Sequence, residues 1–96
     1  MSQFESAPIA FVYFTASWCG PCKAVSPMFD QLKRQTSSAM FVKVDVDKDE
    51  EIVAKFKIES VPTLIVLKKG VIVQRLIPTA KTFESIVMQY TSTSST

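Results

Sequence analysis

The chain has 96 residues, of which 47% are hydrophobic and 21% are charged, a composition typical of one small packed domain rather than a disordered chain. Its formal net charge is only +2 and its basic residues form no block, so we expect no nucleic-acid partner. No apolar run approaches the length of a membrane span, and we expect no membrane partner.

The chain begins with a short polar segment, residues 1–8, which we expect to form either a helical stub or a loose arm. Residues 9–15 are apolar, aromatic and β-branched, which predicts a strand buried on both faces. This run does not fit a secretory signal, because Glu5 rather than a basic residue precedes it and cleavage after Ala16 would remove the strand. We therefore expect a cytoplasmic protein.

Both cysteines lie in the turn that follows, where residues 18–23 read Trp-Cys-Gly-Pro-Cys-Lys. If a helix begins here, its unpaired N–H groups and positive dipole end favour the thiolate of Cys19, which is then the nucleophile. Cys22, inside the first turn, is placed to close a disulfide with it. We expect Pro21 to fit the first helical turn and Gly20 to permit a tight backbone beside the sulfur.

Three alternatives to a redox pair are weaker. A zinc site needs four ligands, and the chain has no third cysteine and no histidine, so we expect no metal. A disulfide scaffold usually carries more cysteines at wider spacing. Two buried structural cysteines do not suit so turn-like a segment. A Cys-X-X-Cys between a strand and a helix therefore favours redox chemistry.

The middle of the chain alternates helix and strand. Apolar residues at three- and four-residue steps predict a helix over residues 21–36 that continues past Pro27 with a kink. Residues 40–45 predict a second strand. The acidic residues after it precede and open a short helix over residues 50–56.

The last third of the chain predicts a hairpin and a closing helix. Residues 64–67 and 71–77 are typical of paired strands, and apolar residues from Phe83 onward recur at helical spacing. The order predicts an α/β fold with two parallel strands, an antiparallel hairpin and helices on both faces of one mixed sheet. We expect a single domain over residues 1–90 and a disordered Ser/Thr tail over residues 91–96.

The chain resembles the thioredoxin family at two motifs. Residues 18–23 match the family's active-site motif residue for residue, and residues 60–63, Ser-Val-Pro-Thr, match the segment whose cis proline faces the disulfide. The resemblance covers residues 9–90 and implies a thioredoxin-like fold with a four- to five-stranded sheet. Family members usually begin with an extra strand and helix. Too few residues precede position 9 for both, so we expect the first strand to be missing and a sheet edge to be uncovered.

The resemblance implies Cys19 and Cys22 as catalytic residues. It implies redox tuning by Gly20, Pro21, Tyr13 and Lys43. Family members generally have a buried Asp, a proton relay for the resolving cysteine, where this chain has Tyr13. Tyrosine, with an ordinary pKa of about 10, is a poor base at neutral pH. Either Tyr13 is a core aromatic and water or Lys43 handles the proton, or Cys22 is activated slowly. Lys43 matches a family lysine near that path, and a plain surface lysine fits equally well.

The resemblance also implies a substrate-binding surface around the disulfide. Its expected members are Trp18, Val61, Pro62, Thr63 and Ile77. The main chain beside a cis Pro62 is expected to pair with an extended partner segment. Ile77 stands where the family has a Gly, which favours apolar contact and a narrower or different set of partners. Instead of binding substrate, Trp18 could simply pack against the domain, and the two roles are compatible.

The leading functional hypothesis is a thioredoxin-type protein disulfide reductase. No nicotinamide or flavin fingerprint is present, so electrons must come from an external thioredoxin reductase or an equivalent donor. We expect disulfide-containing protein substrates, no bound cofactor and a monomer. One alternative is a partner-binding module with weak turnover, which Tyr13, Ile77 and the short N-terminus favour and the two cysteines oppose. Another is a redox protein dedicated to one substrate.

Overall fold

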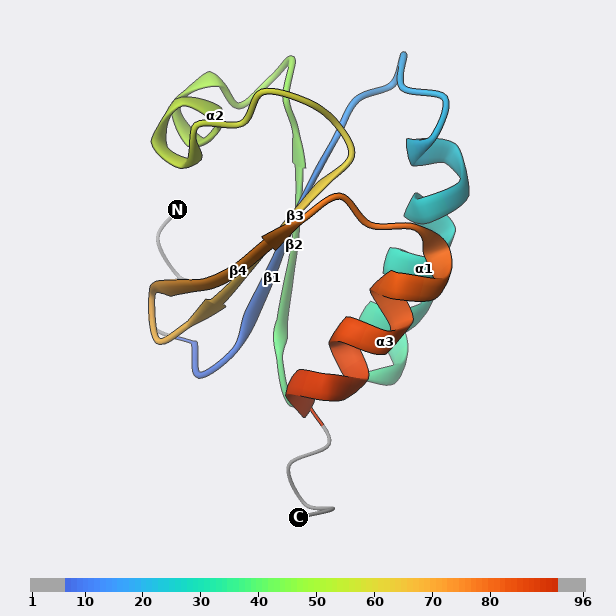
Figure 1. Cartoon of the computed structure of the whole chain (residues 1–96), viewed down its shortest axis with the longest axis vertical. Coiled ribbons are helices and arrows are strands. Elements are labelled where there is room, and N and C mark those ends of the chain that lie inside the picture. Colours follow the sequence, from blue (N-terminus) through green and yellow to red (C-terminus); the bar gives the residue numbers. More distant parts are fainter. Residues whose placement is uncertain (1–6, 92–96) are drawn as a thin grey trace.

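The computed structural model of the chain describes residues 7–91. Its elements are β1 (Ala10–Thr15), α1 (Cys22–Gln35), β2 (Met40–Asp45), α2 (Glu50–Phe56), β3 (Thr63–Lys68), β4 (Val71–Leu76) and α3 (Ala80–Thr91). The strands form one sheet in the order β2-β1-β3-β4. β1 pairs parallel with β2 and antiparallel with β3, and β4 pairs antiparallel with β3. Helices α1 and α3 lie on one face and α2 on the other (Figure 1).

This arrangement confirms the predicted mixed sheet with helices on both faces. Four strands are present within residues 7–91. The predicted loss of a first strand concerns a segment of which residues 1–6 lie outside the described part. The predicted tail began at Thr91, which instead closes α3 with its Oγ1 donating to the Val87 carbonyl at 2.6 Å. Residues 92–96 lie outside the described part. Within residues 7–91, no helix is long and apolar enough to cross a membrane.

Strand β1 is the centre of the molecule and contributes to two cores. Phe11 and Tyr13 pack in the core beneath α1 and α3. Ala10, Val12 and Phe14 pack in the core beneath α2. All five side chains are fully buried, as expected for a strand covered on both faces.

The core beneath α1 and α3 is rich in aromatic rings. The Tyr13 ring stacks on Phe29 of α1 with centroids 5.2 Å apart, and Phe83 of α3 meets both rings edge-on at 5.7 Å. Such ring pairs add to the free energy gained from burying apolar surface. This packing fixes α1, the helix that follows the cysteine turn, against the centre of the sheet.

One end of the sheet collects four connecting segments (upper end in Figure 1). The turn at residues 16–21 leaves β1 there, and the loop at residues 46–49 leaves β2. Because β3 runs antiparallel to β1, its leading segment at residues 57–62 reaches the same end. β4 returns to it, so residues 77–79 join the group. The fold thus brings together segments that are far apart in the sequence.

Candidate active site

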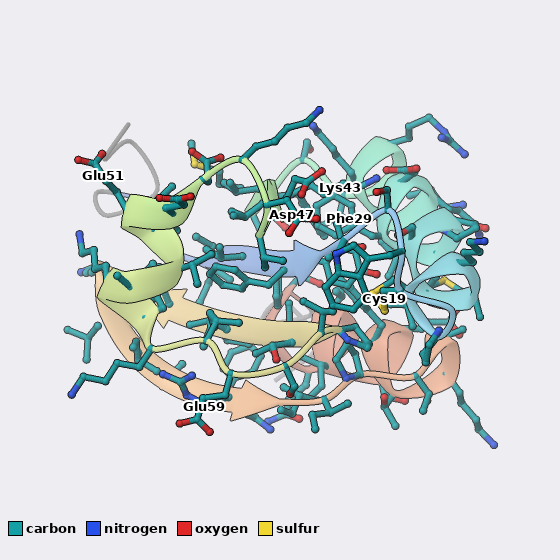
Figure 2. All side chains as sticks on the ribbon, turned by 90° about the horizontal axis from the view of Figure 1, so that it is seen from above. Cys19, Phe29, Lys43, Asp47, Glu51 and Glu59 are labelled. Carbon is teal, nitrogen blue, oxygen red and sulfur yellow. A yellow bond between two sulfur atoms is a disulfide. The ribbon has the colours of Figure 1, made fainter. Side chains whose placement is uncertain are left out.

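The two cysteines form a disulfide at the N-terminal end of α1 (Figure 2). Cys19 precedes the helix and Cys22 is its first residue, with their Cα atoms 5.3 Å apart. Their exposed fractions are only 3% and 2%. The predicted ring between the two residues is confirmed. Within residues 7–91, no group of three or more His, Cys, Asp or Glu side chains is placed to hold a metal ion.

The Cys19 sulfur takes the place of a helix cap. The Cys22 N–H donates to Cys19 Sγ at 3.2 Å, whereas Pro21, the N-cap residue, supplies no side-chain cap. The first turn of α1 also contains no acidic residue. An acceptor at this point is stabilised by the unpaired N–H groups and by the helix dipole. In the reduced protein the same environment favours negative charge on Cys19, the form that attacks disulfides.

Gly20 and Pro21 lie between the two cysteines, and the structure describes the backbone of both. Pro21 has φ −58° and ψ −30°, so its ring suits the start of the helix as predicted. A Cβ at Gly20 would meet no atom within 4 Å apart from those of its two chain neighbours, and Gly20 has no positive φ. The expected tight backbone beside the sulfur stays a prediction. The lack of a side chain at Gly20 leaves open space beside the disulfide.

The segment at residues 60–63 lies against the disulfide. The Val61–Pro62 peptide bond is cis, as the resemblance implied, and Val61 packs against the buried cysteine cluster. Thr63 Oγ1 donates to the Ser60 carbonyl at 2.7 Å and so closes the turn. Among residues 7–91, the main chain of Val61 has no hydrogen-bond partner. Its N–H and C=O are available to an extended polypeptide.

Trp18 joins the cysteine turn to the loop after β2. Its side chain is 66% exposed, and its Nε1–H donates to Asp47 Oδ2 at 2.8 Å. The Asp47 N–H in turn donates to Asp45 Oδ1 at 2.9 Å. Figure 2 shows Asp47 and Cys19 on neighbouring loops. Sequence reasoning missed Asp47, because the alternating acidic residues after β2 indicated only a helix start.

The Tyr13 hydroxyl reaches the first turn of α1. It lies 3.1 Å from Ser26 Oγ, and it donates to the Cys22 carbonyl at 3.4 Å. The ring is a core aromatic, in agreement with one of the two interpretations, but its polar end contacts the turn that carries the resolving cysteine. Ser26 was missed by sequence reasoning. Its spacing of four residues from Cys22, on the same helix face, was the available signal.

Lys43 is held against the flank of α1. Its Nζ lies 3.0 Å from Asp30 Oδ1 and 5.4 Å from the centroid of the Phe29 ring (Figure 2). Lys43 also lines a hollow that borders Cys22 and Ser26. Both interpretations of this lysine thus have a structural counterpart. Asp30, its partner, carried no signal in the sequence.

Two further hollows lie on either side of the segment before Pro62. The first, of about 230 Å³, is mainly apolar and lies between that segment and Trp18. The second, of about 240 Å³, contains charged residues and reaches Ile77. Ile77 is 68% exposed and follows β4 directly. The residues expected to bind substrate therefore lie at one end of the sheet, with Val61 packed against the cysteine cluster and Ile77 lining the second hollow.

Comparison with known proteins identifies this arrangement. The family model described as Thioredoxin matches residues 2–92. The chain belongs to the thioredoxin family. It is 36% identical to Thioredoxin H5 of Arabidopsis thaliana over 80% of this chain and 65% of that protein. It is 40% identical to Thioredoxin-2 of Saccharomyces cerevisiae over 79% of this chain and 78% of that protein.

Solved thioredoxin structures agree with the fold. A Plasmodium falciparum thioredoxin superposes with a TM-score of 0.86 at 32% identity, covering 93% of this chain and 88% of that one. An Entamoeba histolytica thioredoxin mutant gives 0.84 at 32% identity, covering 92% and 87%. The match spans less than two thirds of several plant relatives, with 65% of Thioredoxin H5 and 62% of Thioredoxin H4 of Arabidopsis thaliana covered.

Proposed function

We propose that the chain is a protein disulfide reductase that works by dithiol-disulfide exchange. The observation that carries this proposal is the Cys19–Cys22 pair at the start of α1, with the Cys22 N–H donating to Cys19 Sγ. This geometry suits a pair that alternates between a dithiol and a disulfide. Membership of the thioredoxin family supports the same chemistry.

The reaction proceeds in two exchange steps. The Cys19 thiolate attacks one sulfur of a partner disulfide, so that the partner's S–S bond breaks and its other sulfur leaves as a thiolate that takes up a proton. Cys22 then loses its proton and attacks Cys19, which releases the second partner sulfur. The partner gains two electrons, and this chain loses them as it forms the Cys19–Cys22 disulfide. An external thioredoxin reductase or equivalent donor returns the pair to the dithiol.

Substrate docking is proposed to use the surface around the disulfide. An extended partner segment would pair with the free main chain of Val61, beside Pro62 and Thr63. Trp18 and Ile77 would contact the partner from the two sides. Because Gly20 has open space around it, a partner sulfur can approach the pair from this direction. Exposed Ile77 would favour apolar contact.

The partners follow from this chemistry. We propose disulfide-containing proteins as substrates and a separate reductase as donor, with the chain acting as a monomer, without a bound cofactor, in the cytoplasm. Family membership supports the substrate class and the donor.

A second candidate is a partner-binding module with weak turnover, and a redox protein dedicated to one substrate is a third. Tyr13 favours the binding module, because a fully buried hydroxyl stands where family members generally have a carboxylate. Ile77 favours the binding module too, because its exposed side chain favours apolar contact and a narrower or different set of partners. The intact cysteine pair opposes a purely structural role.

The deciding experiment is single-turnover reduction of a model protein disulfide by the pre-reduced protein. Reduction that vanishes in Cys19→Ser and stalls as a covalent adduct in Cys22→Ser would establish the reductase and assign both sulfurs. Little reduction by the wild type, with both thiols shown to be free, would favour the binding module. Trapping with Cys22→Ser would distinguish a general reductant, which captures many proteins, from a dedicated one, which captures a single protein.

A further inference from the structure

The hollow that reaches Ile77 carries an excess of positive charge. Its lining contains two cations, Lys57 and Arg75, and one anion, Glu59. Its uncharged lining residues are Ser60, Thr63, Leu76 and Ile77. All three charged side chains are exposed, so the hollow is open to a partner.

The guanidinium of Arg75 is already positioned. Its Nη2 donates to the Phe56 carbonyl at 2.7 Å, which anchors the side chain to the end of α2. The remaining N–H groups of an arginine can still bind a carboxylate, and a fixed fork loses less side-chain entropy when it does so. Within residues 7–91, Glu59 forms no ion pair with Lys57 or Arg75, so both cations remain open to a partner, while Glu59 offsets part of their charge. Figure 2 shows Glu59 at the periphery, away from Cys19.

The hollow adjoins the place where a substrate chain must pass. Ser60 and Thr63, which line it, flank the Val61–Pro62 bond, and Val61 packs against the cysteine cluster. A polypeptide whose cysteine reaches Cys19 and whose main chain meets Val61 therefore continues toward this hollow on one side. On the other side it meets the apolar hollow beside Trp18, whose indole is bonded to Asp47.

We propose that the Lys57–Arg75 hollow selects partner proteins that carry Asp or Glu close to the attacked cysteine. This inference rests on the proposed reductase function and names a class of substrate for it. An acidic side chain is attracted by the two cations, whereas the Asp47 carboxylate, which accepts the Trp18 hydrogen bond, disfavours it on the opposite side. The hollow thus determines which charge is preferred in the partner and on which side of the attacked cysteine the charged residue lies.

The test compares two disulfide-bonded peptides that differ in one residue near the target cysteine, Glu in one and Gln in the other. The measured quantity is the ratio of their kcat/KM values. Because exposed ion pairs are weak, we expect the ratio to favour the Glu peptide about two- to fivefold at low salt. The preference should shrink as ionic strength rises.

Variants that change the charge of the hollow should change the Glu-to-Gln ratio of kcat/KM in opposite directions. Arg75→Gln and Lys57→Gln should move it toward one, and Glu59→Gln should raise it. Lys33→Gln, the same change in charge in the last turn of α1, is the matched control and should leave it unchanged. Arg75→Lys retains the charge without the fixed fork and should give an intermediate ratio.

The outcomes distinguish failure of the preference for acidic partners from failure of the reductase function. Reduction of both peptides with a ratio of one, or a ratio that Arg75→Gln and Lys57→Gln leave unchanged, overturns the inference and leaves the reductase intact. A ratio lowered as much by Lys33→Gln shows a general charge effect and also overturns it. No reduction of either peptide, or of a small uncharged disulfide, overturns the reductase and with it this inference.

Discussion

The Tyr13 hydroxyl lies 3.1 Å from Ser26 Oγ and donates to the Cys22 carbonyl, so that the central strand contacts the resolving turn through a neutral group. Family members generally have a carboxylate at the Tyr13 position. A neutral hydroxyl anchors the turn but does not readily accept the proton that Cys22 must lose. This contact therefore bears on the second exchange step rather than on the first.

We predict that Tyr13→Asp accelerates the resolving step and leaves the attack by Cys19 unchanged. A buried carboxylate can take the Cys22 proton, which the hydroxyl does poorly. The two steps are timed separately by rapid mixing with a chromophoric mixed disulfide. Circular dichroism checks that the variant is folded, and Ser26→Ala tests loss of the hydroxyl contact alone. A resolving rate that does not rise in folded Tyr13→Asp contradicts the hypothesis.

The Trp18–Asp47 hydrogen bond should orient the docking surface. Its loss in Asp47→Ala is expected to lower kcat/KM for a protein disulfide about threefold, the effect of a modest net hydrogen bond. Trp18 is the only tryptophan, so its fluorescence reports the change in its surroundings directly. Asp47→Asn retains an acceptor oxygen and serves as the control. If Asp47→Asn loses as much activity as Asp47→Ala, the negative charge and not the acceptor is responsible.

Substituting either Lys43 or its ion-pair partner Asp30 separates the two possible roles of Lys43, proton handling near Cys22 and a surface ion pair. Lys43→Met is expected to slow the resolving step, because it removes a cation from the hollow that borders Cys22. Asp30→Asn should not, because Asp30 does not line that hollow. Both side chains are more than a third exposed, so solvent screening limits the pair to about 0.5 kcal/mol of the free energy of unfolding. Equal resolving rates in the two variants would assign Lys43 to the surface only.

Phe29 should be among the residues that determine stability. It is 1% exposed and packs between Tyr13 and Phe83. Phe29→Ala is expected to lower the free energy of unfolding by about 3–5 kcal/mol, through lost burial and the cavity left behind. Urea unfolding measures this, with Val71→Ala, at a 63% exposed position, as the control. A loss below about 1 kcal/mol would show that α1 is held by other contacts.

The sequence predicted elements and faces better than contacts between them. The continuous apolar run before the cysteine turn predicted the central strand, because burial on both faces leaves that pattern. The cis bond before Pro62 came from family resemblance, since local sequence favours trans. Asp47, Asp30 and Ser26 were missed because their partners are 29, 13 and 13 residues away. Such pairs depend on how strands and helices align in space.

Helix α3 begins near the disulfide end of the sheet and ends at the opposite end, with Thr91 as its last residue (Figure 1). A resin or a sensor surface linked beyond Thr91 would therefore hold the molecule with its cysteines directed away from the support. The fold supplies the orientation that a solid-phase capture reagent requires. Cys22→Ser, immobilised in this way, could collect covalent adducts from a flowing protein mixture and release them with a reducing agent.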